Sequence, residues 1–208
     1  MNTPAQRGSQ ALLTPEKGVP AMNRTLAGLI GLAVSIAAHA EIFTIDAGHS
    51  GIGFSVKHMM VSNTKGSFNT FEGTLDYDIA TKTLKSGEGA IDAGSIDTNN
   101  KSRDEHMRNE DFFNVAMFPK MAFKSSSVKK MDEGRFEVTG TLTVLGVDRE
   151  VILPVTINGP VDDPWGNKRI GLECNTVLNR RDLGITHSPA AMIADEVKID
   201  IAAEATYK

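Results

Sequence analysis

The side chains best suited to chemistry are four histidines beyond residue 40, His49, His58, His106 and His187, and the single cysteine, Cys174. The histidines are far apart and include no i, i+4 pair that would place two imidazoles on one helix face, so the spacing predicts no metal site. One cysteine forms no internal disulfide and no cysteine-cluster site. The sequence has no Gly-x-Ser-x-Gly turn, and Cys174 lies within a strand pattern. We therefore expect no nucleophile–base pair and no catalytic residues.

Two charged stretches admit a structural and a ligand-binding interpretation. Arg103, Asp104 and His106 lie together on a predicted helical turn. We expect them to form a local network that holds a helical lid, and contact with a ligand head group is the alternative. The stretch Arg180–Asp182 follows a strand pattern. It is either a solvated strand end with an exposed ion pair or a cationic rim for a diphosphate, which the guanidinium fork of Arg181 would bind.

Period-two alternation of apolar and polar residues dominates the rest of the chain, and it is typical of half-buried strands. The alternating runs are 43–46, 52–58, 73–79, 90–93, 121–128, 135–144, 151–157, 170–178 and 197–206. Phe68 and Phe71 are three positions apart, which breaks the alternation of apolar and polar residues. We therefore predict a bulge near Asn69-Thr70 that turns both side chains inward. The segment 99–115 is rich in helix formers and opens with Asn-Asn, which predicts one or two short helical turns.

Eight or nine such strands predict an all-β fold, a single closed antiparallel β-barrel of about eight strands with short helical segments near residues 100–115. A two-sheet sandwich is the alternative. The inward faces of the strands would serve equally as a packed core or as the wall of a ligand cavity. His58 would accordingly be either a hydrogen-bonded histidine of the core or a polar group at one end of the cavity. The inward residues assigned to a binding site are Phe54, Val56, His58, Phe68, Phe71, Phe123, Phe136, Leu142, Leu172, Cys174, Leu178, Val197 and Ile199.

The first forty residues have the pattern of an export signal. Leu26–Ala38 carries no charge over 13 residues, follows Arg24 and ends at Ala38-His39-Ala40, a small-x-small cleavage site. We predict cleavage between Ala40 and Glu41. Met22 would be a normal start for the signal, so residues 1–21 are either a leader or the result of a mis-assigned start. Residues 41–208 then form the exported domain.

The charge of the chain argues against one class of function, nucleic-acid binding. Asp and Glu number 26 against 22 for Lys and Arg, which gives a net charge of −4 and no basic excess for binding a phosphate backbone. We expect no nucleic-acid partner.

Ordered motifs across nearly the whole exported domain resemble the YceI-like family of bacterial periplasmic proteins. The first is HSGIGFSVKHMMVSNTKGSFNTFEG from His49, which resembles HS, an alternating strand, a His and then G-x-F-x-x-F-x-G. The pattern continues in the same order with SIDTN from Ser95, RDEHM from Arg103, DFF from Asp111, FP from Phe118, FKS from Phe123, GTLT from Gly140, GV from Gly146 and NRRDLG from Asn179. Leu183 stands where many members have Phe.

The resemblance implies a lipocalin-like barrel in the periplasm with an apolar cavity that sequesters or carries a polyisoprenoid, either a polyprenyl phosphate or an isoprenoid quinone. The resemblance implies no enzymatic activity and no cofactor besides that ligand. It also leads us to expect a homodimer and transient contact with a membrane. Two rivals stay open. One is an enzyme that acts on such a lipid with His58, His106 and Asp104 as acid–base groups. The other is an interaction module whose cavity is incidental.

Overall fold

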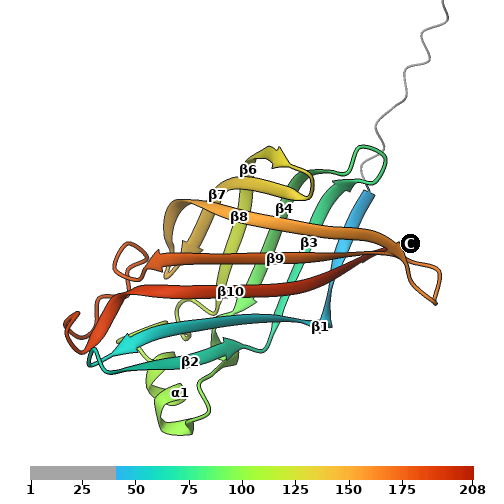
Figure 1. The fold of residues 1–208 in the computed structure, drawn as a ribbon. Helices are drawn as coiled ribbons and strands as arrows, with labels where there is room; N and C mark the ends of the chain where they lie inside the picture. Colours follow the sequence, from blue (N-terminus) through green and yellow to red (C-terminus); the bar gives the residue numbers. More distant parts are fainter. Residues whose placement is uncertain (1–40) are drawn as a thin grey trace, which may run out of the picture. The chain divides into compact units, whose positions relative to one another are not determined.

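The computed structural model describes residues 41–208, so the predicted leader, signal and cleavage site lie outside the described residues. Figure 1 shows long strands wrapped around a common interior, with one helix below them. Neither helix in residues 41–208 is long and apolar enough to cross a membrane. The elements are β1 (Glu41–His58), β2 (Ser62–Phe68), β3 (Phe71–Asp78), β4 (Thr83–Asp92), the 3-10 helix η1 (Ala93–Ser95), β5 (Ile96–Asp97), α1 (Lys101–Arg108), β6 (Lys120–Asp132), β7 (Arg135–Val144), β8 (Val147–Asp162), β9 (Lys168–Asn179) and β10 (Ile193–Tyr207).

Eight of the strands close into an antiparallel ring. The order is β10-β9-β8-β7-β6-β4-β3-β1, and β1 pairs with β10 to complete it, while β2 and β5 extend the sheet beside β1. Closure gives the backbone groups of these strands partners on both sides, which removes the exposed edges of an open sheet. The predicted closed barrel of about eight strands is confirmed, and the sandwich alternative is wrong.

Two short connections between strands shape the ring. Phe68 ends β2 and Phe71 begins β3, so Asn69-Thr70 separate two strands where the sequence predicted a bulge within one. Both rings line the interior, as predicted. Leu145 and Gly146 join β7 to β8 with φ of 53° and 70°. Positive φ at both central residues is the backbone of the two-residue hairpin turn that suits twisted strands.

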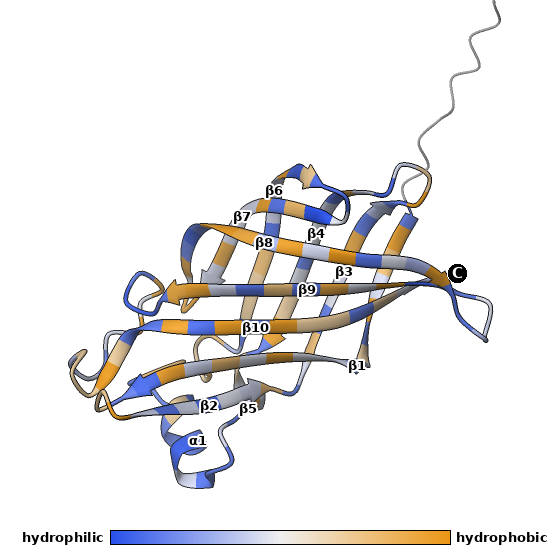
Figure 2. Ribbon diagram, in the orientation of Figure 1, coloured by the Kyte–Doolittle hydropathy of each residue, from blue (hydrophilic) through white to orange (hydrophobic). Residues whose placement is uncertain are grey.

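The interior has two packed clusters at opposite ends, and Figure 2 shows apolar and polar residues alternating along the strands that enclose them. At the packed end, the largest fully buried side chains are Tyr77, Phe43 and Phe136. At the other end, which we call the lid end, a second cluster joins Phe68 to Phe112 and Phe113 of the segment that follows α1. The barrel is therefore closed by strand side chains at one end and by the lid segment, residues 100–118, at the other.

Candidate ligand-binding site

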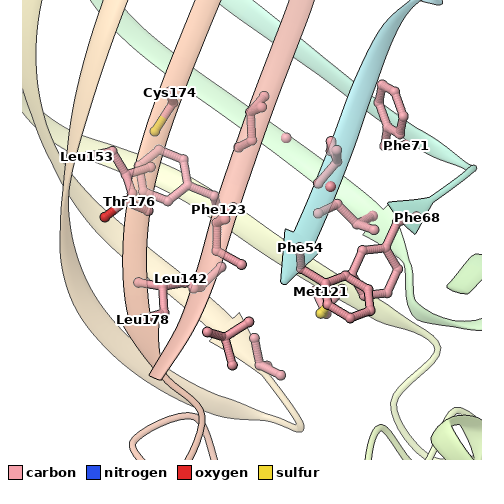
Figure 3. Close-up of a pocket in the computed structure, with 18 of the residues that line it drawn as sticks. Phe54, Phe68, Phe71, Met121, Phe123, Leu142, Leu153, Cys174, Thr176 and Leu178 are labelled. Carbon is pink, nitrogen blue, oxygen red and sulfur yellow. The ribbon is translucent and has the colours of Figure 1, made fainter. Parts of the chain in front are cut away.

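A cavity of about 380 Å³ occupies the barrel between the two clusters. That volume falls within the range of small-molecule sites in proteins, roughly 300–1,000 Å³. Its wall is made of inward side chains from strands all around the ring, and these are overwhelmingly apolar. Figure 3 labels some of them, from Phe54 on β1 to Leu178 on β9, around one common space.

Most of the inward residues predicted from the sequence line this cavity. They are Phe54, Val56, His58, Phe68, Phe71, Phe123, Leu142, Leu172, Cys174, Leu178, Val197 and Ile199. Phe136 is the exception, because it is only 2% exposed and packs in the cluster of the packed end. Its parity was predicted correctly, but its depth along the barrel places it beyond the end of the cavity.

The lid segment supplies wall residues that the sequence analysis missed. Met107 lies on α1, and Phe112 and Phe113 follow it, and all three line the cavity. Phe113 meets Phe68 edge-on, with ring centroids 5.6 Å apart. Met121 also lines the cavity, and its two-residue spacing from Phe123 is the one signal in the sequence that could have identified it.

The absence of a side chain at Gly66 leaves part of this space open. Gly66 lies directly across from Phe54 in the β1–β2 ladder. A Cβ at Gly66 would lie 2.7 Å from Cε1 of Phe54 and 3.0 Å from the Asp97 carbonyl oxygen. The ring of Phe54 can therefore lie close against the backbone of β2 instead of projecting farther into the cavity.

A polar network fastens the start of the lid to the sheet. Asn100 caps α1 by accepting a hydrogen bond from the Arg103 amide (3.0 Å). The Thr98 amide and hydroxyl both donate to Oδ1 of Asp104, at 2.8 and 2.6 Å. Arg103 donates from Nε to the Thr98 hydroxyl (2.8 Å) and from Nη2 to the Thr98 carbonyl (2.7 Å). Arg103 and Asp104 are thus placed to hold the lid, as the sequence analysis expected. The hydrogen bond from the Thr98 hydroxyl is the largest cause of the lowered pKa of Asp104.

His106 is not part of that network. Its Nε2 lies 3.0 Å from Oδ2 of Asp111, and its ring lies 5.4 Å from the ring of His187. The three groups suggested for acid–base catalysis are therefore not assembled, because Asp104 hydrogen-bonds to Thr98 while His106 faces Asp111. His58 and His106 do both line a smaller cavity of about 190 Å³ at the lid end.

Arg180 and Arg181 hold the loop between β9 and β10. Arg180 is 4% exposed. Its guanidinium donates to the carbonyls of Ala194, Ile185, His187, Ser188 and Ile193, at 2.8 to 3.1 Å. Arg181 donates from Nε to Asp195 (2.6 Å) and from Nη2 to the Ser188 carbonyl (2.9 Å). Arg180 therefore does not lie at a solvated strand end, and the donors of both residues are engaged within the chain.

The thiol of Cys174 is a wall group without nucleophilic character. The side chain is 2% exposed, and burial raises its pKa to about 11. A thiol with that pKa is almost entirely protonated near neutral pH, whereas the thiolate is the reactive form.

Comparisons with known proteins agree with this architecture. The family model described as YceI-like domain matches residues 43–205. Protein YceI of Salmonella newport (strain SL254) is 34% identical over 180 residues, which cover 86% of this chain and 93% of that protein.

Solved structures show the same fold. The YCEI protein of Campylobacter jejuni has a TM-score of 0.68 and 31% identity, and the match covers 73% of this chain and 90% of that one. A polyisoprenoid binding domain from Saccharophagus degradans, implicated in plant cell wall breakdown, has a TM-score of 0.65 at 16% identity, with 82% of this chain and all of that one covered.

Proposed function

The chain belongs to the YceI-like family, and from that premise we propose that its barrel binds a long isoprenoid lipid, such as a polyprenyl phosphate or an isoprenoid quinone, and sequesters or carries it. The observation that carries the proposal is the apolar cavity of about 380 Å³ inside a closed barrel. A branched hydrocarbon chain suits such a wall, since each Å² of apolar surface removed from water contributes about 25 cal/mol and requires no polar partner. The polyisoprenoid binding domain of Saccharophagus degradans supports the choice of lipid through a shared fold.

The distribution of polar groups orients the ligand. His58 and Arg103 line the large cavity and the adjoining smaller one at the lid end, whereas the packed end is closed by aromatic and aliphatic side chains. We place the isoprenoid tail along the barrel toward the packed end and the head group under the lid. The head group then lies beside the imidazole of His58 and next to the water-accessible smaller cavity.

The proposed function is binding without chemical change of the ligand. The carboxylate of Asp104 is engaged by Thr98, and the thiol of Cys174 is held in its protonated form. A catalytic role would need a base and an acid directed at the same ligand atom. The pairing of Asp104 with Thr98 argues against the trio of His58, His106 and Asp104.

Delivery from a membrane would take place at the lid end, in the periplasm. The tip of the β1–β2 hairpin exposes Met59, Met60 and Val61, which are 54%, 62% and 82% exposed. Met192 lies beside them, and its carbonyl accepts a hydrogen bond from the Met59 amide (2.8 Å). An apolar tip next to the cavity supports the transient membrane contact, and the export pattern of the sequence supports the periplasm.

Extraction of lipid from protein purified from its native periplasm, followed by mass spectrometry, tests the proposal. We expect an isoprenoid in the wild type. Leu172→Asp should lower the amount by at least about tenfold, because a carboxylate without a partner is costly in an apolar cavity. The matched control is Val177→Asp on the outer side of the same strand, where Val177 is 51% exposed, and it should keep its lipid.

Two outcomes would overturn the proposal. Folded Leu172→Asp with a full complement of lipid would mean that the cavity is not the binding site, as for an interaction module with an incidental cavity. Conversion of added polyprenyl diphosphate or quinone that depends on His58 or His106 would mean that the protein is an enzyme. Chromatography of the lipids after incubation with purified protein distinguishes unchanged ligand from product.

A further inference from the structure

Three side chains that are distant in the sequence meet at the lid end. His106 lies near the end of α1, Asp111 follows the helix, and His187 belongs to the loop between β9 and β10. The two oxygens of Asp111 face the two rings, with Oδ2 3.0 Å from Nε2 of His106 and Oδ1 3.4 Å from Nδ1 of His187. One ligand atom from each residue lies within 4.8 Å of the other two.

We propose that His106, Asp111 and His187 bind a divalent transition-metal ion of the Zn²⁺ type, which fastens the lid to the β9–β10 loop. Two imidazoles and one carboxylate form a ligand set that suits zinc, whereas magnesium and calcium take oxygen ligands. Bonds of about 2.1 Å in a tetrahedron separate ligand atoms by about 3.4 Å. The separations from Asp111 lie near that value, at 3.0 Å from Oδ2 to His106 and 3.4 Å from Oδ1 to His187. One atom from each of the three residues lies within 4.8 Å of the other two, so a single ion between them would draw all three ligands closer together.

A second cluster in the described part of the chain shows why this one is the better cation site. Asp46, His49 and Glu204 also bring ligand atoms within 4.8 Å of one another. There the guanidinium of Arg169 already binds both carboxylates, at 2.9 Å to Asp46 and 2.6 Å to Glu204. Within residues 41–208, the ion pairs of Asp111 are with the two histidines alone, so no permanent side-chain cation fills the lid-end cluster.

Packing beneath the cluster holds the ligands in place. Phe112 is buried, and its ring centroid lies 5.1 Å from that of His106 and 5.0 Å from that of His187. The three ligand side chains themselves are between one-third and one-half exposed, so an ion can enter from solvent. Both imidazoles also line the smaller cavity, and a fourth coordination position is left for water or a ligand oxygen there.

A metal at this position would join two segments that the backbone connects only through strands β6 to β9. His106 and Asp111 belong to the lid segment, and His187 belongs to a loop that Arg180 fixes to the barrel. The bound ion would therefore hold the lid closed over the large cavity. The site stands independently of the proposed lipid, because none of its three ligands lines the large apolar cavity.

Calorimetric titration of the purified protein with Zn²⁺ tests the site. The protein is produced from the full chain without a histidine tag, stripped with a chelator and titrated in a non-coordinating buffer. We expect one saturable Zn²⁺ site per chain and no comparable binding of Mg²⁺. His187→Ala and Asp111→Asn should each weaken binding by at least about tenfold, since even loss of a group behind a metal ligand costs about that much. His49→Ala, which disrupts only the other cluster, should leave the affinity unchanged.

Hydrogen exchange provides a second measurement. In the wild type, Zn²⁺ should slow exchange of the α1 amides, and it should have no such effect in His187→Ala. Absence of saturable binding, binding that survives both ligand variants, or loss of binding in His49→Ala would each overturn the proposal. Because the three ligands are partly exposed, the variants should fold, and unfolding curves without metal should overlay that of the wild type.

Discussion

Arg180 is the side chain whose replacement we expect to disturb the lid end most. Its buried guanidinium donates to five carbonyl oxygens of the β9–β10 loop and the start of β10. Nη2 also lies 3.0 Å from Oδ1 of Asp195. Arg180→Met keeps much of the apolar stem but removes every donor. The five carbonyls and the carboxylate then each lose a partner, and the Ser188 carbonyl and Asp195 keep their hydrogen bonds from Arg181.

The expected cost follows from this count of contacts. Loss of one member of a buried charged network typically costs about 3–5 kcal/mol, because the groups left behind stay poorly solvated. The free energy of unfolding of a domain is about 5–15 kcal/mol, so Arg180→Met should remove roughly a third of it or more. Arg180→Lys keeps the charge but offers three donors in place of the guanidinium fork, and about half of the loss should persist.

Urea unfolding followed by circular dichroism measures these values, and Arg181→Met is the matched control. Arg181 is about one-third exposed, and its main contact is the ion pair with Asp195, so its replacement should cost about 1 kcal/mol or less. The reasoning is refuted if Arg180→Met loses less than about 1 kcal/mol, or if Arg180→Lys is as stable as the wild type. Amide exchange at Ile185, which donates to the Arg180 carbonyl (3.0 Å), reports separately whether the loop alone has loosened.

Three further expectations concern the cavity, the lid and export. Gly66→Ala should turn the Phe54 ring into the cavity and reduce the lipid recovered by extraction. Gly53→Ala is the control and should not reduce it, because a Cβ at Gly53 would have no neighbour closer than 3.7 Å. Equal recovery of lipid from the two variants would contradict this expectation. Asp104→Ala should lower the free energy of unfolding by about 1–3 kcal/mol, because it leaves donors of Thr98 unpaired. Since hydrogen bonds hold the pKa of Asp104 below its ordinary 3.8, that difference should be constant down to about pH 4 and shrink only below it. Urea unfolding at several pH values checks this, and a difference that shrinks above about pH 5 would contradict it. Intact mass of the periplasmic form should place its N-terminus at Glu41, and a form that retains Leu26–Ala38 would contradict the predicted cleavage.

The fold could be predicted from the sequence because alternation is a local property of a strand. Side chains two residues apart lie on the same face whatever the neighbouring strand is. The runs that contain Phe54, Leu142 and Leu172 therefore identified inward positions before any pairing was known. The change of alternation between Phe68 and Phe71 was equally local, and it placed the interruption at Asn69-Thr70.

Depth along the barrel was decided only by the tertiary structure. Parity assigns Phe136 and Phe123 to the same inward face, but the register of the closed ring puts the first in the packed end and the second beside the cavity. Neighbouring arginines also looked alike in the sequence, and the path of the loop around them made Arg180 buried and left Arg181 partly exposed.

The convergence at the lid end was likewise absent from any sequence spacing. His106 and His187 belong to segments without a regular period, so neither side chain's direction follows from local pattern. They meet because closure of the sheet places the lid segment against the loop that follows β9. The sequence by itself thus determined which faces of the strands turn inward. Contacts between distant segments decided where the interior is packed, where it is hollow and which polar groups meet at the lid end. These three features depend on the register between strands and on closure of the barrel, and the order of residues within one strand does not fix them.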